Sequence, residues 1–197
     1  MISFQQTPRI AVAAAAILGG ALAFTFPASA KMQQVPASRI TLDVPDGYSV
    51  SKHLPGFINE TTGASVIAVE MPAAACADFK KDDFAAKLAA NGFANVKAAT
   101  LPFKGEHIYV TAEQATAAGA FAKFLLIFHD ATTTAMLTVN VLKADVTSGK
   151  LKASDVEAML QTAALASAKA EAQVLPFTLG YLGPFKAAGT MGHAQLY

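Results

Sequence analysis

The stretch that most constrains the fold is Ala120–Asp130 (AFAKFLLIFHD), the most apolar run after the first thirty residues. Side chains alternate between the two faces of a strand, so Phe124, Leu126 and Phe128 share one face while the residues between them share the other. Both sets are largely apolar, and a strand with two apolar faces needs cover on both sides. The run therefore predicts the central strand of an α+β fold, in which helices pack on the faces of a mainly antiparallel sheet.

The strands on either side can be registered against this run. If Ala117–Gly119 is a three-residue hairpin loop, counting back places Glu113 opposite Lys123, a favourable cross-strand pair of opposite charges. The same count places His107 opposite His129. With a four-residue loop before the third strand, the main core face of this meander holds Ile108, Val110, Phe124, Leu126, Phe128, Leu137, Val139 and Val141.

The other face of the meander carries an apolar cluster formed by Tyr109, Leu125, Ile127 and Met136. An apolar cluster among polar neighbours is typical of a ligand or partner surface. The alternative is that a helix or the C-terminal segment covers the cluster, as expected for a layered fold.

Turn and periodicity signals predict the remaining elements. We expect strands over 39–44 and 48–50, a turn at 45–47 between them, and a hairpin formed by 57–59 and 64–71. An alanine-rich helix is expected over 73–90, and a second helix begins at the capping box Ser154–Glu157 and runs to about Ala170. Another short strand is expected over 175–185. The last residues begin a strand, which indicates either an edge strand or a chain that continues beyond Tyr197.

The first thirty residues have the three regions of a secretory signal peptide. A polar start ends at Arg9, an apolar run follows, and Ala28-Ser29-Ala30 has the small-x-small pattern that signal peptidase accepts. The alternative is an uncleaved anchor, but the apolar run is shorter than the roughly 20 residues that a membrane-spanning helix needs. We predict cleavage after Ala30, leaving a single domain over 31–197 in the periplasm or outside the cell, without a stable membrane span.

The charge balance argues against nucleic acid as a partner. The sequence has 15 Lys and Arg residues and 14 Asp and Glu residues, and Arg9 is the single charged residue before Lys31. The predicted mature domain therefore has 14 charges of each sign, with no net attraction to phosphate. Cys76 is the one cysteine, so an internal disulfide is excluded, and its alanine neighbours predict a small core residue.

The order of these elements, together with the opening ITLDVPDGYSV at Ile40–Val50, resembles the PsbP/Mog1-like group, which includes small exported bacterial envelope proteins. The resemblance covers Arg39 to about Ala170. It implies an α/β/α sandwich built on an antiparallel sheet. It also implies an accessory, binding or assembly role without a shared active site, so no functional residues are carried over.

The histidines offer one metal hypothesis. His107 and His129, if directly opposite, could share a Zn²⁺ or Cu²⁺ ion, because imidazole suits both metals. Two ligands do not complete a site, and a third would have to come from His53 or His193. The alternative is an ordinary histidine pair near the end of the sheet.

No nucleophile elbow or nucleotide motif accompanies the histidines. The sequence has no G-x-S-x-G and no glycine-rich phosphate loop, so no cofactor is expected. The sequence therefore favours a non-enzymatic binding or envelope accessory protein that contacts another envelope protein or a small ligand. The alternative is a metal-dependent enzyme or metal-binding protein using His107 and His129.

Overall fold

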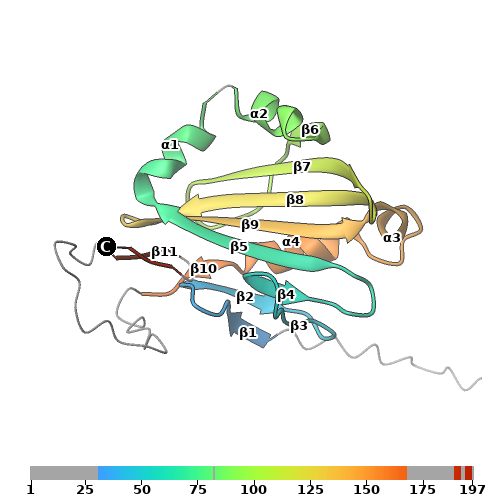
Figure 1. The fold of residues 1–197 in the computed structure, drawn as a ribbon, viewed down its shortest axis with the longest axis horizontal. Coiled ribbons are helices and arrows are strands. Elements are labelled where there is room, and N and C mark those ends of the chain that lie inside the picture. The colour runs from blue at the N-terminus through green and yellow to red at the C-terminus, as the bar shows by residue number, and fades with distance from the viewer. Residues whose placement is uncertain (1–30, 82, 168–188, 192–193, 197) are drawn as a thin grey trace, which may run out of the picture.

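A computed structural model of the chain describes residues 31–81, 83–167, 189–191 and 194–196. The largest sheet is built from β3 (Ser49–Val50), β4 (Gly56–Ile58), β5 (Ser65–Pro72), β6 (Phe93–Ala98), β7 (His107–Thr116), β8 (Gly119–His129) and β9 (Thr133–Leu142). All neighbouring strands pair antiparallel, in the order β3-β4-β5-β9-β8-β7-β6 (Figure 1). The predicted α+β class with a mainly antiparallel sheet is confirmed.

A small sheet lies beside the large one. It consists of β1 (Lys31–Gln34), β2 (Ile40–Val44) and β10 (Ala164–Leu165), in the order β1-β2-β10. A separate hairpin is formed by β11 (Gly189–Met191) and β12 (Ala194–Leu196). The strands expected near 39–44 and 48–50 and the hairpin of β4 and β5 are confirmed, whereas β1 and β6 were not expected. The strand expected over 175–185 lies outside the described residues.

The helices are shorter than expected. The 73–90 segment is a 3-10 turn, η1 (Ala73–Ala75), followed by α1 (Cys76–Phe79) and α2 (Phe84–Ala90). The rings of Phe79 and Phe84 meet edge to face with their centroids 5.4 Å apart. A continuous helix would turn residues five apart about 140° from each other, so the break between α1 and α2 allows this contact.

The second predicted helix is also displaced. After α3 (Lys143–Thr147), α4 (Ala153–Gln161) begins one residue before Ser154 and has no side-chain cap, so the predicted capping box is wrong. The helix ends well before Ala170. The Thr162 hydroxyl donates to the Met159 carbonyl at 2.7 Å and accepts from the backbone N–H of Asp43 at 2.8 Å, which fastens the helix end to β2.

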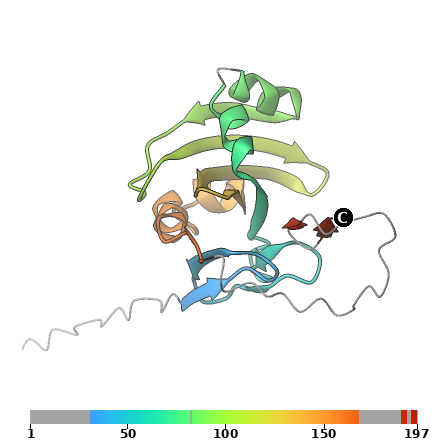
Figure 2. The same cartoon turned by 90° about the vertical axis from the view of Figure 1, so that its left-hand side faces the viewer.

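The two faces of the large sheet have different neighbours. We call the face that packs against α4 and the small sheet the inner face, and the face that carries α1 the outer face (Figures 1 and 2). The inner face holds the main core, to which β8 and β9 contribute as predicted. The buried residues from β8, β9, β2 and α4 are Phe124, Leu126, Phe128, Leu137, Val139, Val141, Ile40, Leu42, Val44, Val156, Met159 and Leu160.

The register of β7 differs from the prediction by one residue. Thr116 pairs with Gly119 around the two-residue loop Ala117-Ala118. The Thr116 hydroxyl accepts from the Ala118 N–H and donates to the Gly119 carbonyl, both at 3.2 Å. Gly119 has a φ of +132°, a conformation that favours glycine, and this lets it serve as a paired strand residue directly after the loop.

This shift moves every side chain of β7 to the other face, because strand side chains alternate with a period of two. Tyr109 lies on the inner face opposite Leu126, whereas Ile108 and Val110 lie on the outer face. The predicted pairing of Glu113 with Lys123 is wrong. Glu113 is opposite Ala122, and its carboxylate lies 2.7 Å from the Lys143 ammonium.

Arg39, directly before β2, joins the small sheet to the large one. Its buried guanidinium donates to the hydroxyls of Thr132 and Thr133 at 3.0 and 2.9 Å and to the Ala166 carbonyl at 2.8 Å. It also pairs with the Asp130 carboxylate at 2.5 Å. Burial opposes ionisation of Asp130, but hydrogen bonds from Arg39 and from the two threonines outweigh it and hold the pKa of Asp130 well below its usual range.

Arg39→Leu should lower the free energy of unfolding by about 2–4 kcal/mol, because removing one partner of a buried ion pair leaves the other groups without their common donor. Urea unfolding at neutral pH measures the effect. The control is Lys52→Leu at an exposed lysine, which should change stability by less than about 0.5 kcal/mol. Equal stability of Arg39→Leu and the wild type would contradict the role of Arg39.

Candidate partner surface and cavities

The two histidines of the metal hypothesis lie on opposite faces of the large sheet. His107 pairs with Phe128 on the inner face, where its ring centroid is 5.3 Å from that of Phe103. His129 pairs with Thr134 on the outer face. The predicted pairing of His107 with His129 is therefore wrong. Within the described part of the chain, no group of three His, Cys, Asp or Glu side chains could hold a metal ion. Metal binding by His107 and His129 stays a prediction, and it lacks the support that two histidines on the same face of the sheet would give.

His129 instead belongs to a surface cluster that fastens α1 to the sheet. Its Nε2 lies 3.3 Å from the Glu106 carboxylate, and the other oxygen of that carboxylate lies 2.7 Å from the Lys80 ammonium. Hydrogen bonds from Lys80 and His129 lower the pKa of Glu106, and the bond to Glu106 raises the pKa of Lys80. Sequence reasoning missed Lys80 as a neighbour of the buried Cys76, although the i,i+4 spacing was a signal for it.

Tyr109 does not belong to the predicted partner surface. It is 2% exposed on the inner face, and its hydroxyl donates to the Glu157 carboxylate of α4 at 3.0 Å. Burial and the neighbouring Glu157 raise the pKa of Tyr109 well above its usual range. The residue is therefore a core contact between β7 and α4, and its assignment to the outer face is wrong because of the shift in register.

The other three residues lie on the outer face as predicted. Leu125 and Ile127 are 2% and 1% exposed, respectively, and α1 contacts their strand, so this part of the face is covered. Met136, opposite Ile127 and Val69, is half-buried. Cover therefore extends over β8 but not over the β5 side.

An apolar stripe runs along this uncovered side. We define the apolar stripe as Ile67, Val69, Met71 and Met136, which occupy alternate positions of β5 and one position of β9 on the same face. Val69 is 36% exposed, and the other three side chains are half-buried. Sequence reasoning found Met136 but not the three residues of β5, because the outer face was considered only for the meander.

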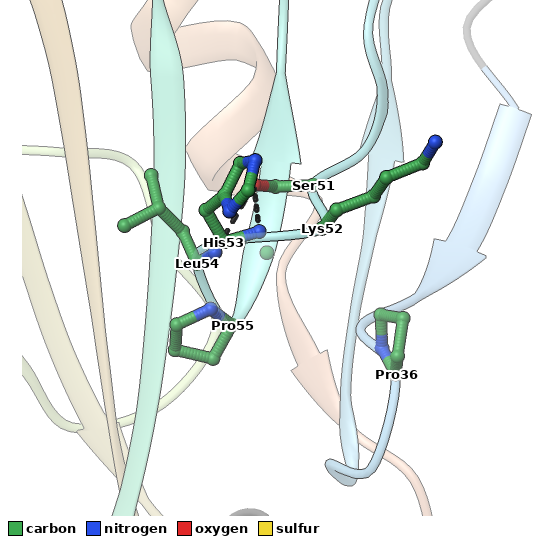
Figure 3. A pocket seen from close by; sticks show the side chains of 7 residues that line it. Pro36, Ser51, Lys52, His53, Leu54 and Pro55 are labelled. Atoms are coloured by element: carbon green, nitrogen blue, oxygen red, sulfur yellow. Dashed lines mark hydrogen bonds between the residues drawn. The ribbon is translucent and has the colours of Figure 1, made fainter.

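A cavity of about 330 Å³ opens between the β1–β2 loop and the β3–β4 loop. It is lined by Pro36, Ser51, Lys52, His53, Leu54, Pro55 and Gly56 (Figure 3). The Ser51 hydroxyl accepts from the backbone N–H groups of His53 and Leu54 at 3.2 and 3.1 Å and so shapes the loop. A Cβ at Gly56 would lie 1.9 Å from the Val66 carbonyl oxygen, so only glycine lets β4 approach β5 here. His53, considered as a third metal ligand, is an exposed residue of this rim.

A second cavity, of about 340 Å³, lies where β6 joins β7 and β8. Its lining residues are Asn95, Lys97, Thr111, Ala112, Glu113, Ala122, Lys123 and Phe124. The pairing of β6 with β7 is irregular between Ala94 and Lys97, and Asn95 has a φ of +52°. This β-bulge re-aims side chains beside the cavity. Sequence reasoning missed the bulge, because β6 itself was not predicted.

Comparisons with known proteins rest on structure alone. No family model matches the chain, and no curated protein sequence does. LpqN from Mycobacterium tuberculosis, described as involved in cell envelope biogenesis, is 15% identical with a TM-score of 0.42, covering 65% of this chain and 83% of LpqN. Cyanobacterial PsbP (CyanoP) from Synechocystis sp. PCC 6803 is 12% identical with a TM-score of 0.40, covering 74% of this chain and 98% of that protein.

Among the helices that the structure describes, none has the length and apolar character needed to cross a membrane.

The uneven cover of the outer face predicts opposite results for two substitutions on it. Leu125→Glu should prevent stable folding, because a buried unpaired carboxylate carries a large desolvation cost. Val69→Glu should leave the protein folded, because that side chain is partly exposed. Near-ultraviolet circular dichroism and thermal unfolding distinguish the two variants. A folded Leu125→Glu protein would show that α1 does not cover β8.

Proposed function

We propose that this protein is an exported, non-enzymatic accessory protein that binds another protein of the cell envelope through the apolar stripe. The observation that carries the proposal is the contiguity of Ile67, Val69, Met71 and Met136 on one sheet face, with Val69 partly exposed. Contiguous exposed apolar side chains are typical of interaction sites, whereas single exposed ones need no explanation.

The charge balance supports an apolar contact. The 14 positive and 14 negative residues after residue 30 give no net charge that would steer a strongly charged partner. We therefore expect the partner to present an apolar segment to the stripe. Thr138, opposite Ile67 and half-buried, would contribute to a polar border of such a contact.

The chemistry-bearing groups of the outer face support a binding role over an enzymatic one. Lys80 and His129 each contact Glu106 and fasten α1, and Cys76 is the buried residue of that helix. These groups stabilise the cover of β8 next to the apolar stripe. A rigid cover would define one border of the binding surface.

Export is the second part of the proposal, and the Ala28-Ser29-Ala30 pattern supports it. Cleavage after Ala30 would place the new N-terminus at Lys31, the first residue of β1. The four residue pairs between β1 and β2 would therefore be retained in the mature protein.

Expression of the full chain in bacterial cells should yield an exported protein that begins at Lys31. Ala30→Leu should block processing, because signal peptidase requires a small residue there, while Ser29→Leu at the tolerant position between the two alanines should not. Mass spectrometry of the protein from the periplasmic and membrane fractions measures both. An intact N-terminus in the wild-type protein would refute cleavage.

A photo-cross-linking residue at position 69 should form a discrete adduct with an envelope protein in living cells, and one at position 32 should not. Met32 is the matched control, because it is 58% exposed and lies on β1 of the small sheet. Val69→Glu should weaken binding to the purified adduct partner by about tenfold, because it places a charge in a desolvated contact, while Met32→Glu should not. Equal cross-linking at both positions, or unchanged binding by Val69→Glu, would refute the role of the stripe.

A further inference from the structure

The cavity at β6, β7 and β8 lies on the inner face, opposite to the apolar stripe. Thr111 and Phe124 are cross-strand partners, Glu113 pairs with Ala122, and Lys97 pairs with Thr111. Paired residues share a face, and Phe124 belongs to the inner core. The walls of the cavity are therefore Lys97, Thr111 and Glu113, while Ala122 and Phe124 form its floor.

The charges around the cavity sum to a positive value. The Glu113 carboxylate lies 2.7 Å from the Lys143 ammonium and accepts from Asn95 Nδ2 at 2.9 Å. These two contacts lower the pKa of Glu113, so the group is ionised and already paired. Lys97 also acts on Glu113 by its charge, but within the described residues it has no carboxylate within ion-pair distance. Lys123, the other lysine of the lining, belongs to the outer face, where its ammonium lies 5.6 Å from the centre of the Phe93 ring. Lys97 is therefore the cation of the lining that is left for a ligand on the inner face.

The floor and the size of the cavity set the rest of the ligand. Ala122 is half-buried and Phe124 is buried, so the floor of the cavity is apolar. A volume of about 340 Å³ lies near the lower end of the range of roughly 300–1,000 Å³ that is typical of small-molecule sites. The Thr111 hydroxyl and the Asn95 amide supply donors and acceptors at the wall.

We propose that this cavity binds a small organic anion, in which a carboxylate contacts Lys97 and an apolar group of about one ring lies on Ala122 and Phe124. The proposal is independent of partner binding by the apolar stripe, because the two surfaces lie on opposite faces of the sheet.

Titration of the purified protein with benzoate, followed by the amide resonances in ¹H–¹⁵N NMR spectra, tests this site. Benzoate should shift the amides of 111–113 and 122–124 saturably, and the neutral analogue benzyl alcohol should bind there more weakly. Lys97→Gln should weaken benzoate binding by about fivefold, the effect of a partly exposed charge pair, and leave benzyl alcohol unchanged. The control Lys104→Gln, at an exposed lysine outside the cavity lining, should change neither.

Ala122→Leu is the second variant, because the larger side chain would fill the floor. It should abolish the shifts from both probes, while the rest of its NMR spectrum stays that of a folded protein. The proposal is overturned if benzoate and benzyl alcohol bind equally, if Lys97→Gln leaves benzoate affinity unchanged, or if the saturable shifts fall outside β6, β7 and β8. Absence of saturable binding by benzoate would overturn it as well.

Discussion

The architecture depends on one buried cation, the guanidinium of Arg39. A three-stranded sheet of short strands has little stability alone, and here it is held to the large sheet at the loop between β8 and β9. A buried charge is tolerated only where it is paired and hydrogen-bonded, and Asp130 and the Ala166 carbonyl meet that requirement. Lysine could not replace arginine here, because a single ammonium cannot reach all the acceptors that surround the planar guanidinium. The Glu70 carboxylate accepts from the backbone N–H of Arg39 and fixes the same corner from β5.

The break between α1 and α2 determines how much of the outer face is covered. A continuous helix over 73–90 would have been long enough to cross several strands at 1.5 Å per residue. The observed segment instead turns after Phe79, so η1 and α1 contact β9 and β8, whereas α2 contacts β6. Leu125 and Ile127 are buried under it, while Val69 on β5 stays partly exposed. The exposed apolar stripe is therefore a result of how short the cover is, since the sheet itself is apolar on both faces.

The fold class, the central strand and the inner face of β8 and β9 could be predicted from the sequence. Apolar residues occupy alternate positions along both strands, and this pattern fits one arrangement of the two strands. The sequence was insufficient for β7, whose two faces are similarly apolar, so the register depended on the assumed loop length. The charge pair of Glu113 with Lys123 favoured the wrong length. The Thr116 hydroxyl and the positive φ of Gly119 decided the loop, and both are local effects that hydrophobic patterning does not reveal. β6 was missed for a related reason: a bulge at Asn95 interrupts its alternation.

The same one-residue shift changes what the sheet could bind. In the predicted register, Glu113 would face Lys123, and two imidazoles would meet at the end of the sheet. In the observed register, Lys123 lies on the outer face with its ammonium 5.6 Å from the centre of the Phe93 ring, and Glu113 turns to the inner face toward Lys143. Glu113 thereby becomes a wall of the cavity, and its pairing with Lys143 leaves Lys97 as the uncompensated charge there. The register that separates the histidines is thus the one that creates a positively charged cavity, and a shift back would remove the cavity as it restored the pair.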